Sequence, residues 1–314
     1  MFGKKLRQLP TLVALVTIPF LTPAFSPGPQ QAANELVMLN VTVRNPDGQN
    51  LTGLTRDAFE LLDEKQVRSV AFFENTEAPV SIGILVDTSS SMQLFDTRDT
   101  TRAKPIGDAI SELLEHGNPA NEYFVIAFDS KPRFLTDWKS ARELLDQKPA
   151  LLQEKQDTAL FDACWVALEK FNTARNPRRA LILFSDGSDN VSKLSFKKLR
   201  ERLKASDLTL YGVGVVTGAD IGTALGMEGQ SILGELVDAT GGEAFFPESK
   251  KALSSVVKQI ALELRHKYRI GFEADKTSVS NKWHSLKIRV NPPANVGAEF
   301  KKVIVRSRPG YFTK

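Results

Sequence analysis

The stretch VSIGILVDTSSS, residues 80–91, passes directly from a continuous apolar run into an Asp and four hydroxyl side chains. A run this short, rich in β-branched residues, is typical of a strand rather than a core helix. Its lack of alternation predicts a strand over Val80–Val86 that is buried on both faces, as in a parallel sheet. Ligands of open α/β sheets bind beyond the carboxyl ends of the strands, where we expect Asp87 and the serines that follow it.

Further apolar runs follow, and helical patterns separate them. They predict strands over Tyr123–Phe128, Ala180–Phe184, Leu208–Val216 and Glu243–Phe246. Apolar residues at helical spacing predict helices that end at Gly117 and that cover Leu160–Phe171, Leu194–Ala205, Ile232–Ala239 and Ala252–Leu264. This alternation predicts an α/β fold of the doubly wound, Rossmann-like kind, with a mostly parallel sheet.

Both flanks of this region show the alternation of strands that have one exposed face. The predicted flanking strands are Leu36–Arg44, Phe59–Leu62, Val67–Phe73, Tyr268–Phe272, Ser285–Val290 and Lys302–Arg306. Neither flank alone has enough strands for a stable two-layer fold. We therefore expect one β-sandwich built from both ends of the chain, with an N-terminal β segment at 35–78, an α/β domain at 79–265 and a C-terminal β segment at 266–314.

The first residues, 1–26, have the order of a secretory signal peptide. Three basic residues precede an apolar run, Leu9–Leu21, and small residues follow it. The run is shorter than the roughly 20 residues of a spanning helix, and no later run is long enough. We expect a secreted or periplasmic protein with no membrane span in the mature chain, and the cleavage site stays open.

The charge of the chain bears on its class of partner, and its cysteine content bears on how the fold is stabilised. The full sequence has 41 Lys and Arg and 37 Asp and Glu. Three of the basic residues and none of the acidic ones lie in the leader, so the mature chain has 38 basic and 37 acidic residues. A nearly neutral mature chain argues against general affinity for nucleic acid. Cys164 is the only cysteine, so no internal disulfide can form and a packed core must stabilise the protein.

Two later segments complement the pattern Asp87-x-Ser89-x-Ser91. They are DTALFDA at 157–163 and FSDG at 184–187, the second at the end of a predicted strand. In this order, the three segments resemble the von Willebrand factor type A (VWA) domain, from Val80 to about Leu264. The flanks resemble those of bacterial exported proteins that contain a VWA-related domain. The resemblance implies a metal-ion-dependent adhesion site for Mg²⁺ or Mn²⁺, with ligands Asp87, Ser89, Ser91, Thr158 and Asp186.

The chemistry of these ligands suits such a site. Mg²⁺ prefers hard oxygen ligands in octahedral geometry and usually keeps water or substrate in some positions. Three of the five residues are neutral hydroxyls, so the ion stays attractive to a further anionic oxygen. We therefore predict a binding module that captures a protein partner through an Asp or Glu carboxylate, and no catalytic residues.

Two other functions remain as alternatives. A structural or scaffolding exported domain would have the same loops without using an ion. A Mg²⁺-dependent hydrolase of the aspartate-nucleophile kind is less favoured, because it needs a second Asp two residues after the first, where this chain has Ser89. Asp162 and Asp189 are interpreted as helix-face or turn residues rather than ligands. The sequence leaves open the partner, the choice of ion and the oligomeric state.

Overall fold

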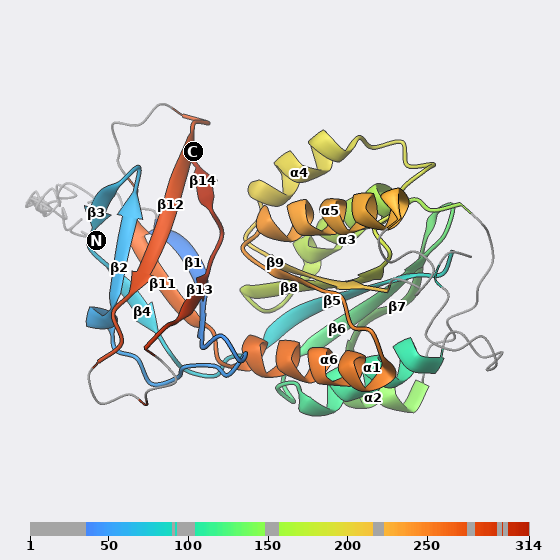
Figure 1. Cartoon of the computed structure of the whole chain (residues 1–314), viewed down its shortest axis with the longest axis horizontal. Helices are drawn as coiled ribbons and strands as arrows, with labels where there is room; N and C mark the ends of the chain where they lie inside the picture. The colour runs from blue at the N-terminus through green and yellow to red at the C-terminus, as the bar shows by residue number, and fades with distance from the viewer. Residues whose placement is uncertain are drawn as a thin grey trace, which may run out of the picture. The chain divides into compact units, whose positions relative to one another are not determined.

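Strand β5 (Val80–Asp87) is buried along its whole length in the computed structural model of the chain, and it lies inside a six-stranded sheet (Figure 1). The structure describes residues 36–89, 92, 104–147, 157–215, 223–274, 280–293, 297 and 301–313. The predicted signal peptide, residues 1–26, and the predicted ligand Ser91 lie outside the described residues.

The six-stranded sheet has the order β10-β9-β8-β5-β6-β7. Its other members are β6 (Glu122–Phe128), β7 (Pro132–Ser140), β8 (Arg178–Ser185), β9 (Thr209–Gly214) and β10 (Glu243–Phe245). Only β7 is antiparallel to its neighbour; the other pairs are parallel. The chain adds β6 and β7 on one side of β5 and the later strands on the other, so the strand order reverses beside β5. Such a switch point is where open α/β sheets bind ligands.

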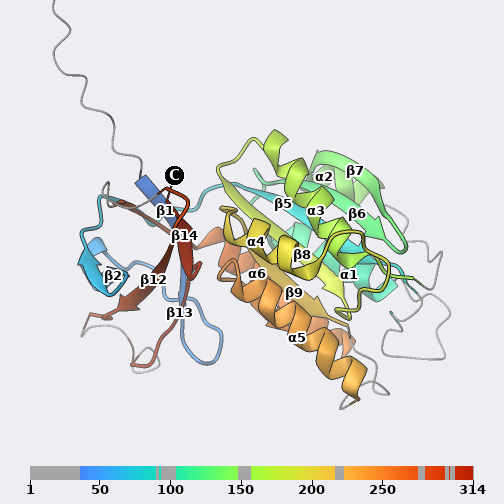
Figure 2. The ribbon, with the colours of Figure 1, turned by 90° about the horizontal axis from the view of Figure 1, so that it is seen from above.

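Helices cover both faces of this sheet (Figures 1 and 2). The helices of one face are α1 (Lys104–His116), α2 (Ala141–Gln147) and α6 (Lys250–Arg265); those of the other are α3 (Leu160–Lys170), α4 (Phe196–Lys204) and α5 (Ala224–Asp238). Successive residues of β5 point to opposite faces, so Ile84 packs in the core with α1 and α6, and Leu85 in the core with α3 and α5. The predicted doubly wound α/β fold is confirmed.

The flanks form two four-stranded antiparallel sheets. The first has the order β13-β1-β11-β4, with β13 (Ile304–Arg306), β1 (Leu36–Arg44), β11 (Tyr268–Glu273) and β4 (Phe72–Glu74). The second has the order β14-β12-β2-β3, with β14 (Gly310–Phe312), β12 (Trp283–Val290), β2 (Phe59–Asp63) and β3 (Gln66–Arg68). Both sheets pair N-terminal with C-terminal strands and share one core. The predicted sandwich made from both ends of the chain is therefore confirmed.

Some predicted elements are wrong in detail. The run Val67–Phe73 is not one strand, because β3 pairs with β2 in one sheet and β4 pairs with β11 in the other. Helix α5 begins at Ala224, eight residues before the predicted start. The sequence patterns also failed to indicate β7, α2 and the short β14; two 3-10 turns complete the described elements, at Arg56–Ala58 and Phe171–Thr173.

The residues Glu35–Lys314 group into one compact unit, and the predicted domain boundaries within it stay a prediction. Within the described part of the chain, no helix combines the length and the apolar character that crossing a bilayer requires.

Candidate metal site

Asp87 is the last residue of β5, and only 2% of its surface is exposed. Its Oδ1 accepts a hydrogen bond from the Ser89 amide at 2.9 Å, and its Oδ2 accepts one from Ser185 Oγ at 2.8 Å. Strand pairing explains the second contact, because Val86 lies opposite Phe184 and the next residues, Asp87 and Ser185, end their strands together. The carboxylate is therefore oriented both by its own loop and by the neighbouring strand.

The electrostatic surroundings of Asp87 favour a cation. Burial raises the pKa of Asp87 to about 7, against the effect of hydrogen bonds from Ser89 and Ser185, and the charge of Asp186 raises it as well. Among the described residues, no Lys, Arg or His forms an ion pair with Asp87 or Asp186. A buried carboxylate without a positive partner is costly. The buried Asp87 and the half-buried Asp186, which lie within electrostatic range of one another and offer hard oxygen donors, fit a divalent metal ion.

Asp186 enters the site from the turn that follows β8. Its Oδ1 accepts a hydrogen bond from the Ser188 amide at 2.8 Å, and the Gly187 amide donates to Ser185 Oγ at 3.0 Å. Gly187 has a φ of 88°, in the left-handed region that favours glycine. The sequence Ser-Asp-Gly thus forms a tight turn that holds the half-buried Asp186 at the end of the sheet.

Thr158 is buried in the loop that precedes α3. Its amide donates to Asn190 Oδ1 at 2.8 Å, and its carbonyl accepts from the Asn190 amide at 3.0 Å. The next residue, Ala159, donates its amide to the carbonyl of Asp129 at 2.7 Å. These hydrogen bonds therefore connect the Thr158 loop to the segments that follow β8 and β6. Asp87, Thr158 and Asp186 come from three loops at the same edge of the sheet, as the sequence predicts.

Two nearby carboxylates stabilise these loops. Asp189 Oδ2 accepts hydrogen bonds from the Phe161 amide at 2.9 Å and from Ser192 Oγ at 2.5 Å. The two oxygens of Asp162 accept hydrogen bonds from backbone amides of residues 193 and 194, both at 3.0 Å. Asp189 therefore lies in a turn, and Asp162, in the first turn of α3, joins that helix to the loop that follows β8.

Sequence reasoning missed the supporting roles of Ser185 and Asn190, and it named Asp189 without its contact to Phe161. Each contacts a residue far away in the chain, such as Ser185 with Asp87, 98 positions earlier. No local spacing reveals a contact of this kind. The only available signal is that Ser185 directly precedes the Asp of the Ser-Asp-Gly turn.

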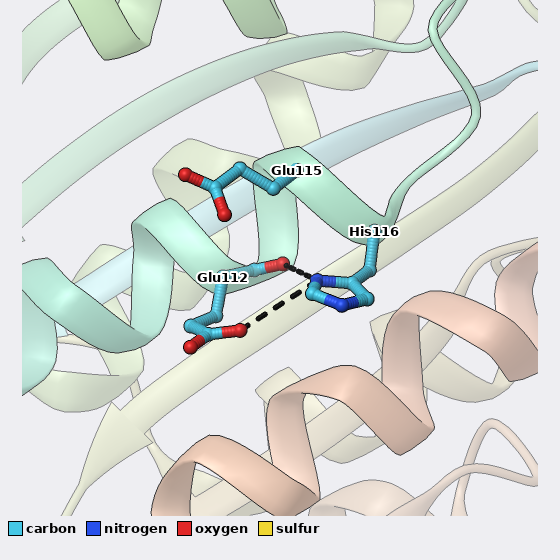
Figure 3. Close-up of side chains that lie close together, drawn as sticks. All are labelled: Glu112, Glu115 and His116. Carbon is cyan, nitrogen blue, oxygen red and sulfur yellow. Dashed lines mark hydrogen bonds and ion pairs between the residues drawn. The ribbon is translucent and has the colours of Figure 1, made fainter.

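A second group of candidate ligand atoms lies on α1, where Glu112, Glu115 and His116 come within 4.8 Å of one another (Figure 3). His116 Nδ1 is 2.9 Å from the Glu112 carbonyl oxygen and 3.6 Å from Glu112 Oε2. Lys258 Nζ lies 3.0 Å from the same Oε2, and its hydrogen bond is the main cause of a lowered pKa of Glu112. Lys258 therefore already balances the charge of Glu112, and the group is a surface ion-pair cluster.

The fold and the site together define a class of protein: an open α/β sheet with oxygen-bearing side chains at its switch point. Residues 82–188 match the family model of the von Willebrand factor type A domain. The chain therefore contains a von Willebrand factor type A domain, as the three sequence segments indicate. Domains of this family are generally interaction modules rather than enzymes, and they often bind a divalent metal ion.

Several solved structures are similar to this chain. One is an aerotolerance-related membrane protein of Bacteroides fragilis, 16% identical, which covers 57% of this chain and 97% of its own at a TM-score of 0.44. BatB of Bacteroides thetaiotaomicron is 18% identical, covering 59% and 98% at a TM-score of 0.43. A von Willebrand factor type A protein of Catenulispora acidiphila is 12% identical, covering 90% and 76% at a TM-score of 0.48. No curated protein matches this sequence. With identities this low, nothing about function follows from these likenesses.

Proposed function

We propose that the protein is an exported binding module that captures a carboxylate of a protein partner through a divalent cation, Mg²⁺ or Mn²⁺. The proposed ligands are Asp87, Ser89, Ser91, Thr158 and Asp186. One observation carries the proposal: the Asp87 carboxylate is buried, lies within the field of a second carboxylate, and has no basic partner among the described residues. A bound cation would neutralise both groups.

The donor set supports binding of a further anion. Asp87 and Asp186 supply at most two negative charges, and the other proposed ligands are neutral hydroxyls. These two charges only balance the charge of a divalent ion, so the site has no excess negative charge that would repel an anion. Such ions commonly retain exchangeable coordination positions. A carboxylate of a partner would take one of these positions. No nucleophile, acid or base is assigned to this chain.

Titration of Mg²⁺ and of Mn²⁺ into the chelator-treated chain tests the metal site. We expect binding in the wild type, and a rise in melting temperature because a ligand that binds only the folded state stabilises it, by about 2.7 kcal/mol at a hundredfold excess over Kd. Asp87→Asn keeps the size of the side chain but removes its charge, and should abolish both effects. Asp157→Asn removes one exposed charge from the Thr158 loop and is the matched control, which should bind normally.

Two results would contradict the metal proposal. One is a wild-type chain that shows neither heat nor a change in melting temperature with either ion. The other is an Asp87→Asn variant that binds as tightly as the wild type. The first result would favour a structural module that uses no ion.

The captured carboxylate can be tested separately on the Mn²⁺-loaded chain. Bound Mn²⁺ that keeps exchangeable water speeds the relaxation of bulk water protons. We expect this effect, and expect acetate to reduce it by displacing that water, whereas acetamide should not. Equal effects of the two compounds would argue against carboxylate capture.

Export rests on the sequence of residues 1–26 alone. When a bacterial host expresses the full chain, the protein should appear outside the cytoplasm with a mass reduced by the leader. A chain that stays in the cytoplasm at full mass would contradict this part of the proposal.

A further inference from the structure

Helix α5 touches the turn of the proposed metal site through its backbone. Gly229 is buried in the second turn of α5, and a Cβ atom placed there would lie 2.2 Å from the carbonyl oxygen of Asp186. In the other direction, a Cβ atom on Gly187 would lie 2.1 Å from the Gly229 carbonyl oxygen. Real Cβ atoms essentially never come within 3.0 Å of such atoms. The helix and the turn therefore pack so closely that neither position accommodates a side chain.

This contact bears on where Asp186 can lie. The hydrogen bonds of the Asp186 turn join residues 185–188 to one another, so they define its shape. Its carbonyl oxygen, however, rests against α5, and any shift of the helix toward the sheet must move Asp186. A displaced backbone moves the carboxylate with it. Helix α5 is thus the packed support of one proposed ligand.

Glycine is otherwise a poor choice inside a helix, because it forms helix less readily than alanine. A Cβ atom on Gly234 of the same helix would meet nothing within 4 Å, so no neighbour requires a glycine there. At Gly229 the neighbour is backbone, which cannot rotate away as a flexible side chain can. Gly229 and Gly234 therefore differ in their surroundings although they lie in the same helix.

We propose that Gly229 is a positioning residue for the metal site. The close packing of α5 against the Asp186 turn determines the position of the Asp186 carboxylate and therefore the affinity for the ion. This inference rests on the proposed function, because it concerns the same site. It adds that α5, which contributes no ligand and lies far along the chain from the ligand residues, controls the affinity for the ion.

Gly229→Ala and Gly234→Ala test the proposal as a matched pair. Each adds one methyl group to α5 and raises helix propensity equally, but only the first meets the Asp186 backbone. Both variants are titrated with Mn²⁺ and melted without metal. We expect Gly229→Ala to weaken Mn²⁺ binding by about tenfold or more, the usual effect of disturbing a residue that orients a metal ligand, and Gly234→Ala to leave the affinity within about twofold of the wild type.

The outcomes separate this inference from the proposed function. If the wild type binds Mn²⁺ and Gly229→Ala binds it equally well, the positioning role is refuted and the metal site stands. A lower melting temperature with unchanged affinity is a purely structural effect and refutes it too. If the wild type binds no metal, the proposed function fails and the positioning role fails with it.

Hydrogen exchange of the wild-type chain gives a second test that needs no variant to fold. Coupling between two sites is reciprocal, so an ion that fixes Asp186 should slow amide exchange in the first ten residues of α5, 224–233. Helix α4 packs in the same core as α5 and serves as the internal control, with little change expected. Unchanged exchange in α5 when Mg²⁺ is demonstrably bound would refute the proposal.

Discussion

Substitution of Gly83 by alanine should destabilise the sheet that presents Asp87. Gly83 lies in the middle of β5, and a Cβ atom there would come within 2.4 Å of Phe124 Cζ and 2.8 Å of Leu181 Cδ1. Phe124 is fully buried and packs edge-on against Trp138 and Phe171, with ring centroids 4.8 and 5.3 Å away. The ring cannot yield without disturbing these neighbours.

The expected magnitude follows from two opposed effects. Overpacking a close-packed core costs about 1–3 kcal/mol, whereas replacing glycine by alanine stabilises by about 0.4–1 kcal/mol through the unfolded chain. The middles of these two ranges give a net loss of about 1 kcal/mol in the free energy of unfolding. Gly212→Ala in β9 is the matched control: its nearest neighbour, Val237 Cγ1, would lie at 3.4 Å, an ordinary contact. That variant should be neutral or slightly stabilised.

Equilibrium unfolding in urea, followed by circular dichroism, measures the free energy of unfolding of both variants. The two values are compared when both transitions depend equally steeply on the urea concentration. Phe124→Leu adds a further test, because a smaller side chain should relieve the clash. The double variant Gly83→Ala/Phe124→Leu should then be more stable than the sum of the two single losses predicts. If Gly83→Ala unfolds at the same urea concentration as Gly212→Ala, the argument from packing is refuted.

Two other groups give independent predictions. Burial raises the pKa of Glu122, but hydrogen bonds from Ser81 and Arg175 outweigh it and hold the pKa below 4.5. Ionised Glu122 therefore stabilises the fold above pH 4.5, and this contribution is lost as the pH falls through the lower pKa of the folded state. Glu122→Gln should lower the free energy of unfolding by about 1–3 kcal/mol at pH 7, and by progressively less below pH 4.5. Urea unfolding at a series of pH values measures this difference. A cost independent of pH would refute this account. Burial, with a smaller effect from Asp189, raises the pKa of Cys164 to about 12, so iodoacetamide should leave the native chain unmodified at pH 8 and react only in urea; rapid modification without urea would contradict the buried position.

The α/β core could be predicted from the sequence because its strands are nearly continuous apolar runs. Val80–Val86 differs from β5 by a single residue, and Tyr123–Phe128 from β6 by one. Such runs need two covered faces, which few folds other than a doubly wound sheet provide. Strand β7 escaped prediction because it lies at the sheet edge and is only half buried, so it lacks both the continuous run and a regular alternation.

Elements that depend on distant partners were harder to predict. The run Val67–Phe73 looks like one strand, but its two ends pair with β2 and β11, which lie in different sheets. The beginning of α5 was missed because the residues Ala224–Gly229 include two glycines, which normally indicate a loop. The same glycine at 229 permits the close contact with Asp186, so the feature that weakened the helical pattern is explained only by the tertiary structure.

The acidic residues of the site differ in their burial and in the segments that they contact. An ionised carboxylate can accept about four hydrogen bonds or metal contacts. Asp162 and Asp189 use their oxygens on amides and a hydroxyl of the adjoining loops, so they fix loop geometry. Asp87 accepts two hydrogen bonds, as Asp162 does, and Asp186 accepts one, but Asp87 is buried whereas Asp162 is only half buried. Residue type and order suggested the ligands, and the burial of Asp87 beside a second carboxylate, rather than its number of hydrogen bonds, distinguishes it from the carboxylates that hold the loops.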